Sequence, residues 1–172
     1  MRSIERATVL DVLWQGPHSL EDACKADTSE DYGLYQVYGT HAVLGSDCLL
    51  YIGLTKDGGE KRRFGQRFLE HAEEWIKWEN LITGIYLGRL GGIEPIDESR
   101  HKEWGDMIAR AESLLIYYCS PPYNSKGIKQ IDKTAPPTIV MNFGRRHRLP
   151  MIVSNLYEQS PVDDDVFKPY SV

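Results

Sequence analysis

Tyr32-Gly33-Leu34-Tyr35-Gln36-Val37-Tyr38 and Cys48-Leu49-Leu50-Tyr51-Ile52-Gly53 are the two stretches that decide the expected fold. Both are rich in aromatic and branched residues, which favour β-strands, and the first ends at Gly39. They predict a hairpin with a long loop from about Gly39 to Asp47. A tyrosine beside a glycine is common at strand ends. The two stretches therefore indicate a functional site only in combination with the residues that follow them.

Two amphipathic helices are expected after the hairpin. Apolar side chains recur at steps of three and four residues after the turn at 55–59, which predicts a helix over about 60–80. A second helix is expected over about 99–119, because Pro121 and Pro122 follow and prevent its continuation. The apolar stripes consist of Phe64, Phe68, Ala72, Trp75 and Ile76 in the first helix and of Trp104, Ile108, Ala111, Leu115 and Tyr118 in the second.

Further strands are expected between and after the helices. Residues 82–90 form one strand pattern, bounded by a turn that contains Gly91, Gly92 and Pro95. Two more patterns, 138–143 and 151–156, are joined by the basic turn 144–150.

The two ends of the chain are less regular. Residues 7–14 are apolar and are followed by Gly16 and Pro17, and periodicity over so few residues leaves a strand and a short helix both open. From Ser160 onward the chain is acidic and contains proline, so we expect it to lie loosely on the surface.

The order of elements predicts an α+β (mixed α/β) fold with a small central sheet flanked by helices. The length of 172 residues suits one domain with short extensions. We expect an N-terminal extension over 1–31 and a main domain over 32–130. The strand pair and tail over 131–172 are expected to pack on that same domain.

Composition restricts the class of protein. Three cysteines without metal-ligand spacing argue against a disulfide framework and against a zinc finger, and favour a reducing compartment. No leader-like N-terminus and no apolar run of about 20 residues is present in the sequence, so we expect a cytoplasmic protein that does not enter a membrane. The net charge of -5 counts against indiscriminate coating of nucleic acid.

Positive charge is nevertheless clustered in two places, which leaves room for a local phosphate-binding face. A solvated helix start and a solvated turn would explain the same clusters. The clusters are Lys61, Arg62 and Arg63 with Arg67, and Arg145, Arg146 and Arg148 with His147.

Four polar residues of the two helices and the following turn are candidates for chemistry. Arg67 and His71 are four residues apart, so they lie on one helix face beside the apolar stripe. Glu112 falls against the stripe of the second helix, where a carboxylate needs an arginine or a bound cation as compensation. A hard cation such as Mg²⁺ prefers such oxygen ligands. Asn124 follows Tyr123 in the turn after the second helix. Asparagine is common in turns, so a purely structural role would also explain its presence.

The ordered set resembles the GIY-YIG nuclease superfamily. It consists of Gly33-Leu34-Tyr35, Tyr51-Ile52-Gly53, an arginine followed four residues later by a histidine, a helical glutamate, and an asparagine twelve residues beyond that glutamate. The resemblance covers about residues 32–124. It implies a metal-dependent endonuclease that hydrolyses DNA phosphodiester bonds.

The resemblance also implies roles for individual residues. Glu112 would hold one divalent ion, Mg²⁺ or Mn²⁺, that polarises the scissile phosphate. Tyr35 would be the general base or would position the attacking water, and Arg67 would lower its pKa and bind phosphate. The remaining implied roles are water or phosphate orientation by Tyr51, close backbone approach at Gly53, assistance to the tyrosine by His71, bracing by Asn124, and DNA contacts by Lys56, Lys61, Arg62, Arg63, Arg145, Arg146 and Arg148.

The chain departs from the pattern in ways that keep alternatives open. Leu54 stands where some members have a lysine, and the segment between Gly53 and Arg67 is longer than in compact members. A catalytically inactive nucleic-acid-binding module on the same fold is therefore the second reading. A zinc enzyme using His41, His71 or His101 is a third, although their spacing matches no known ligand set. A homodimer would favour cleavage of both DNA strands.

Overall fold

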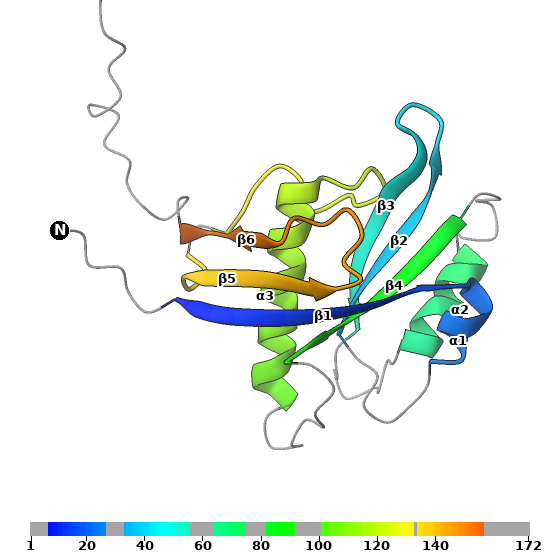
Figure 1. Ribbon diagram of the computed structural model, residues 1–172. Helices are drawn as coiled ribbons and strands as arrows, with labels where there is room; N and C mark the ends of the chain where they lie inside the picture. The colour runs from blue at the N-terminus through cyan, green and yellow to red at the C-terminus, as the bar shows by residue number, and fades with distance from the viewer. Residues whose placement is uncertain are drawn as a thin grey trace, which may run out of the picture.

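The computed structural model describes residues 7–26, 33–55, 64–74, 82–91, 101–132 and 134–156. Within these ranges it contains a six-stranded sheet and three helices, so the expected α+β class is confirmed (Figure 1). The elements are β1 (Thr8–His18), α1 (Leu20–Cys24), β2 (Gly33–His41), β3 (Gly45–Thr55), α2 (Phe64–Glu74), β4 (Ile82–Leu90), α3 (His101–Cys119), β5 (Thr138–Gly144) and β6 (Ile152–Ser154).

The strand order is β3-β2-β4-β1-β5-β6. Neighbouring strands are antiparallel except β1 and β5, which are parallel. Residues 8–18, which the sequence assigned to an N-terminal extension, thus form an interior strand between β4 and β5. This strand joins the hairpin half of the sheet to the C-terminal strand pair.

Strand β1 resolves the ambiguity left by the apolar stretch 7–14. Leu10, Val12 and Trp14 are buried and alternate with more exposed residues, which is the period of two that a half-covered strand requires. The strand continues through Gly16 and Pro17 to His18, with a register irregularity between Gln15 and His18. A side chain at Gly16 would meet the backbone oxygen of Ile85 at 2.7 Å, so glycine allows this close passage.

The hairpin is tighter than expected. The expected loop over 39–47 is wrong, because β2 continues to His41, β3 begins at Gly45, and these two residues still pair. Bulges between Val37 and Tyr38 and between Gly39 and His41 absorb the mismatch in length. Glycine and polar residues, which indicated a loop, here occupy an exposed two-stranded tip that packs little apolar surface.

The remaining elements mostly follow the expected pattern. The strand over 82–90 is confirmed, and β5 and β6 are the expected C-terminal pair, with β6 shorter than predicted. Helix α3 is confirmed over 101–119, and α2 over 64–74, while the expected outer turns over 60–63 and 75–80 lie outside the described residues. Helix α1 was not predicted from the sequence; its N-cap Ser19 accepts a hydrogen bond from the amide of Asp22. The tail from Ser160 also lies outside the described residues.

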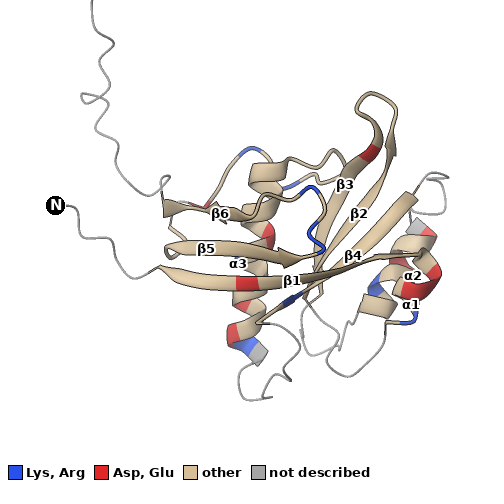
Figure 2. Ribbon diagram, in the orientation of Figure 1, with Lys and Arg blue, Asp and Glu red and all other residues tan. Residues whose placement is uncertain are grey.

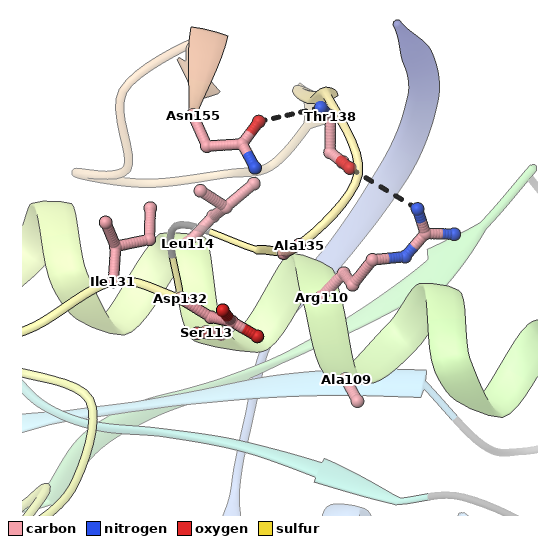
Figure 3. A pocket seen from close by; sticks show the side chains of 9 residues that line it. All are labelled: Ala109, Arg110, Ser113, Leu114, Ile131, Asp132, Ala135, Thr138 and Asn155. Atoms are coloured by element: carbon pink, nitrogen blue, oxygen red, sulfur yellow. Dashed lines mark hydrogen bonds between the residues drawn. The ribbon is translucent and has the colours of Figure 1, made fainter. Parts of the chain in front are cut away.

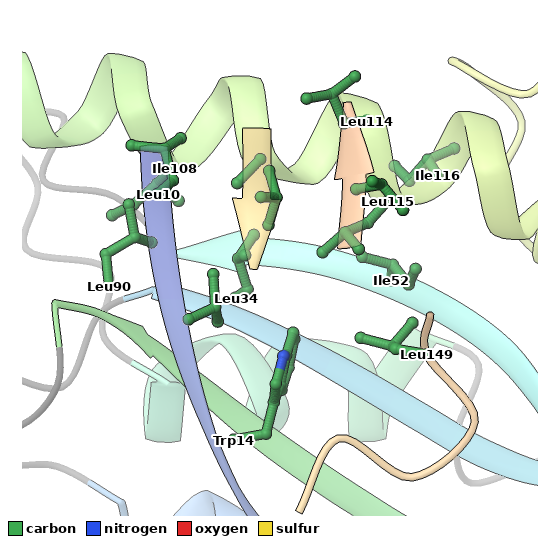
Figure 4. Packing of buried hydrophobic residues seen from close by; sticks show 14 of the residues in the cluster. Leu10, Trp14, Leu34, Ile52, Leu90, Ile108, Leu114, Leu115, Ile116 and Leu149 are labelled. Carbon is green, nitrogen blue, oxygen red and sulfur yellow. The ribbon is translucent and has the colours of Figure 1, made fainter. Parts of the chain in front are cut away.

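The sheet is covered by helices on both faces, but not along its whole width. On one face the larger core packs under α3 and includes Leu10, Leu34, Ile52 and Ile108 (Figure 4). On the other face a smaller core packs between the sheet and helices α1 and α2. Its buried members are Ala23, Tyr35, Val37, Phe64, Phe68, Ile85 and Leu87. Successive residues of β2 therefore enter different cores, since side chains alternate across a strand.

Candidate active site

The side chains of Tyr35 and His71 meet in the smaller core. The hydroxyl of Tyr35 lies 2.6 Å from Nε2 of His71, although the residues are on β2 and α2. The exposed fractions are 0% for Tyr35 and 3% for His71. A hydrogen bond between two buried polar groups is one that neither group can replace with water.

Tyr51 and Gly53 of β3 complete the surroundings of the Tyr35 phenol. The rings of Tyr51 and His71 lie 5.5 Å apart in an edge-to-face arrangement, and those of Tyr35 and Phe68 lie 4.9 Å apart. A Cβ atom at Gly53 would lie 2.3 Å from the Tyr35 hydroxyl oxygen. Position 53 thus requires glycine, because the Tyr35 phenol occupies the space that a side chain there would need.

Arg67 is half-buried and is held by Glu70, whose carboxylate oxygen accepts a hydrogen bond from Nη1 at 2.6 Å. Burial lowers the pKa of the Arg67 guanidinium, but the hydrogen bond to Glu70 and the proximity of Tyr35 outweigh burial and raise it. Glu70 was not predicted as a site residue. A carboxylate three residues after an arginine on a helix is nevertheless at the spacing that favours an ion pair.

The pKa of Tyr35 differs from the expectation. Burial raises it far above the usual value, the neighbouring Tyr51 raises it further, and the charge of Arg67 opposes these effects without overcoming them. The expectation that Arg67 would give a lowered pKa is therefore wrong for this structure, because desolvation of a fully enclosed phenolate is the larger effect. Tyr35 is a protonated phenol at neutral pH.

Glu112 lies on α3 and is half-buried beside fully buried Ala111 and Leu115. It is close enough to Tyr35 for its charge to raise the pKa of the phenol. Of the two arginines considered as its compensation, Arg67 has a hydrogen bond to Glu70, and Arg110 has a long one to Thr138 at 3.4 Å. Within the described residues, no group of three or more His, Cys, Asp or Glu side chains could hold a metal ion.

Asn124 binds the outer edge of β3. Its Oδ1 accepts a hydrogen bond from the amide of Ile52 at 3.0 Å, and its Nδ2 donates to the carbonyl of the same residue at 2.8 Å. The amide side chain thus takes the place of a neighbouring strand on the residue before Gly53. Asn124 therefore holds the segment Tyr51-Ile52-Gly53 in position. No contact between Asn124 and Tyr35 or His71 is among those that the structure describes.

The basic turn packs on the core under α3, whereas the Tyr35–His71 pair lies in the core under α1 and α2. Figure 2 shows this turn as a blue stretch of backbone between β5 and β6. His147 stacks on Tyr86 at a ring distance of 5.2 Å, and buried Leu149 belongs to the core under α3. Asp47, at the hairpin tip, accepts hydrogen bonds from Arg148 and contacts His147, each at 2.9 Å. Arg145, Arg146 and Arg148 are therefore not brought together with the candidate site.

The other basic candidates, Lys56, Lys61, Arg62 and Arg63, lie outside the described residues. The histidines considered for zinc do not gather either, within the part of the chain that the structure describes. Nδ1 of His41 accepts from the amides of Val43 and Leu44 in the hairpin turn, whereas His71 contacts Tyr35. The side chain of His101 is not among those described.

A pocket of about 200 Å³ lies elsewhere, between α3 and the segment that leads to β5 (Figure 3). Part of its polar lining is already engaged. Asn155 accepts from the amide of Thr138 and donates to the carbonyl of Pro136, and Asp132 accepts from Thr134. Because none of the candidate residues lies in its lining, this pocket is not the candidate active site.

Comparison of the chain with models of protein families, with curated proteins and with solved structures finds no match. Within the described residues, no helix is long and apolar enough to cross a membrane. Inference about activity thus rests on the residues and their geometry.

Proposed function

We propose that this chain is a divalent-metal-dependent endonuclease of the GIY-YIG type that hydrolyses DNA phosphodiester bonds. The observation that carries the proposal is the 2.6 Å contact between the Tyr35 hydroxyl and His71 Nε2. Two residues that the resemblance selects as site residues, 36 positions apart, meet in a buried polar pair. Tyr51 and Gly53, chosen on the same grounds, pack directly against that pair.

The pair gives a proton path that does not need an ionised tyrosine. Because the pKa of Tyr35 is raised by burial, the phenol keeps its proton. In this proposal the hydroxyl donates a hydrogen bond to Nε2 of His71, in the tautomer that leaves this nitrogen without a proton. As water attacks phosphorus, its proton passes to the Tyr35 oxygen and the phenolic proton passes to Nε2, which becomes an imidazolium. The bond from phosphorus to the 3′-oxygen breaks, and the leaving 3′-oxygen takes a proton from solvent. His71 is then the base, and Tyr35 relays the proton.

Arg67 suits the phosphate in this proposal. Its guanidinium is charged and only half-buried, and a planar fork of donors matches two phosphate oxygens. Glu70 holds one of its nitrogens, Nη1, in a fixed direction. A half-buried Tyr51 beside His71 is placed to hydrogen-bond the phosphate or the attacking water.

Glu112 fits the ion that the resemblance implies. Mg²⁺ is usually held by one or two carboxylates, with water and substrate phosphate as the other ligands, so a cluster of protein ligands is not required. A half-buried carboxylate near Tyr35 has the right chemistry and surroundings. When bound, the ion would neutralise charge on the phosphate and on the leaving 3′-oxygen.

The proposal is tested by incubating supercoiled plasmid and branched DNA with the protein in Mg²⁺ or Mn²⁺. We expect nicking that stops with a chelator and falls by about 10²-fold or more in Tyr35→Phe and Glu112→Gln. Glu103→Gln, an exposed position on the same helix, is the matched control and keeps wild-type activity. Failure of the wild-type protein to cleave either DNA with either ion contradicts the proposal.

A catalytically inactive nucleic-acid-binding module is the second candidate. The observation in its favour is that Tyr35 has no exposed surface while Glu70 engages Arg67. Such a module would bind DNA equally well before and after Glu112→Gln, and would lose binding when Arg145 and Arg146 are both neutralised. For either candidate a cytoplasmic location agrees with the cysteine content, and DNA is the proposed partner.

A further inference from the structure

The pocket between α3 and the segment that leads to β5 is separate from Tyr35 and His71 and has a chemistry of its own (Figure 3). Its volume is about 200 Å³, whereas sites for drug-sized ligands measure roughly 300–1,000 Å³, so it suits a smaller molecule. The buried side chains of Leu114 and Ile131, both members of the core under α3, form an apolar part of its lining. A ligand of this pocket therefore has a small apolar part.

The part of the lining next to β5 is fixed by hydrogen bonds within the chain. Oδ1 of Asn155 accepts from the amide of Thr138 at 2.7 Å, and its Nδ2 donates to the carbonyl of Pro136 at 3.1 Å. The Thr138 hydroxyl donates to the same carbonyl at 2.8 Å. Asn155 and Thr138 are both buried. A lining held in this way is preorganised, so little affinity is lost in ordering it around a ligand.

Two opposite charges line the pocket without pairing with each other. Arg110 of α3 extends toward Thr138, and its Nη1 donates to the hydroxyl oxygen over a long distance of 3.4 Å. Figure 3 shows Asp132 well apart from this guanidinium, and none of the ion pairs among the described residues joins the two. The other N–H groups of the Arg110 guanidinium have no partner among the described residues, so they are available to an anionic group.

The carboxylate of Asp132 is held in place by Thr134. Its Oδ1 accepts from the Thr134 amide at 2.8 Å and from the Thr134 hydroxyl at 2.7 Å. The hydrogen bond from the hydroxyl, with that from the amide, lowers the pKa of Asp132, so the side chain is charged at neutral pH. Within the described residues, Oδ2 of Asp132 and the hydroxyl of Ser113, which also lines the pocket, have no hydrogen-bond partner. Both are available as acceptors for a cationic group.

We propose that this pocket binds a small zwitterion, an α-amino acid with an aliphatic side chain. Its carboxylate pairs with the guanidinium of Arg110, whose planar fork of donors matches two carboxylate oxygens. Its ammonium pairs with Asp132, and its side chain packs on Leu114 and Ile131. A simple acid leaves the carboxylate of Asp132 unmatched, and a simple amine leaves Arg110 unmatched, so the pocket favours a molecule that carries both charges.

This proposal does not depend on the proposed nuclease activity, because it is read from binding alone. The isotope-labelled full chain is titrated with L-leucine and followed through its backbone amide NMR signals. We expect saturable shifts at Ser113, Thr138 and Asn155, with a dissociation constant of about 0.1–1 mM. Isocaproate, which lacks the ammonium group, and isoamylamine, which lacks the carboxylate, should each bind at least tenfold more weakly than L-leucine.

Substitutions separate the two charges from the apolar lining. Arg110→Gln and Asp132→Asn should each raise the dissociation constant for L-leucine at least tenfold. Ala135→Leu adds apolar volume to the lining without changing its charge and should weaken binding to a similar extent. Lys102→Gln and Asp11→Asn are the matched controls, because both positions are exposed and lie outside the lining. Amide signals far from the pocket show that each variant is folded.

Three outcomes overturn the proposal. The first is the absence of any saturable shift up to about 20 mM L-leucine. The second is isocaproate binding as tightly as L-leucine, which would make the pocket a site for simple acids. The third is a dissociation constant for L-leucine that neither Arg110→Gln nor Asp132→Asn changes.

Discussion

The hydroxyl of Tyr35 and Nε2 of His71 lie 2.6 Å apart, and both side chains are buried. Tyr35 comes from the second strand and His71 from the helix that follows the hairpin. Removal of either partner therefore deletes a hydrogen bond between two buried polar groups.

Tyr35→Phe is expected to lower both stability and cleavage. Loss of the buried hydrogen bond to Nε2 of His71 should reduce the free energy of unfolding by about 1–3 kcal/mol in urea titrations. Tyr118→Phe is the control, because it deletes a hydrogen bond from an exposed tyrosine to the carbonyl of Ser154. A Tyr35→Phe protein as stable as the wild type would contradict the buried hydrogen bond.

Gly53→Ala should displace the Tyr35 phenol. The new methyl group would lie 2.3 Å from the hydroxyl oxygen, and relief of this overlap should destabilise the fold by about 1–3 kcal/mol and abolish cleavage. Gly45→Ala makes a useful comparison. It has no atom within 4 Å of the new methyl group but has a φ of 89°, so it should lose about 1–2 kcal/mol while cleaving normally. Similar activity loss in both variants would mean that stability alone is being measured.

Asn124→Leu should loosen the outer edge of β3. The substitution removes both hydrogen bonds to the backbone of Ile52 and leaves a buried amide and carbonyl unpaired, at a cost of about 1–3 kcal/mol for each group. Native-state hydrogen exchange should show the Ile52 amide exchanging faster, while exchange in β5 reports only the global change. An Ile52 amide that stays protected would show that Asn124 does not hold this edge.

Asp47→Asn should reveal the ion pairs between the hairpin tip and the basic turn. Hydrogen bonding from His147 holds the pKa of Asp47 below its usual value, with Arg148 acting in the same direction. A lowered pKa in the folded state adds stability above the unfolded pKa, and this contribution disappears as pH falls through the folded pKa. The variant should be about 0.2–1 kcal/mol less stable than the wild type at pH 7.

The same comparison at acid pH provides the check. Urea unfolding of both proteins in a series from pH 7 down to strongly acidic pH should show the difference shrinking toward zero as the wild-type carboxyl gains its proton. Asparagine tolerates the positive φ of 53° at this position, so backbone strain does not confuse the result. A difference that does not change with pH would exclude the carboxylate charge as its cause.

Several parts of the fold could be predicted because they depend on local patterns. The strand over 82–90 and the helix over 101–119 were recognised from apolar runs and from steps of three and four residues. The hairpin tip and β1 were harder. Gly39 and Gly16 are turn residues by composition, but Gly39 lies at a register irregularity within β2 and Gly16 makes a close backbone contact within β1.

The sequence by itself determined which residues alternate, which recur at helical spacing, and which polar residues stand out against those patterns. Only the tertiary structure decided that β1 lies between β4 and β5, because strand order depends on contacts between distant segments. It also decided that Tyr35 meets His71, whereas Arg148 lies across the sheet. Burial, which raises the pKa of Tyr35, is a property of the packed core that composition and spacing do not contain.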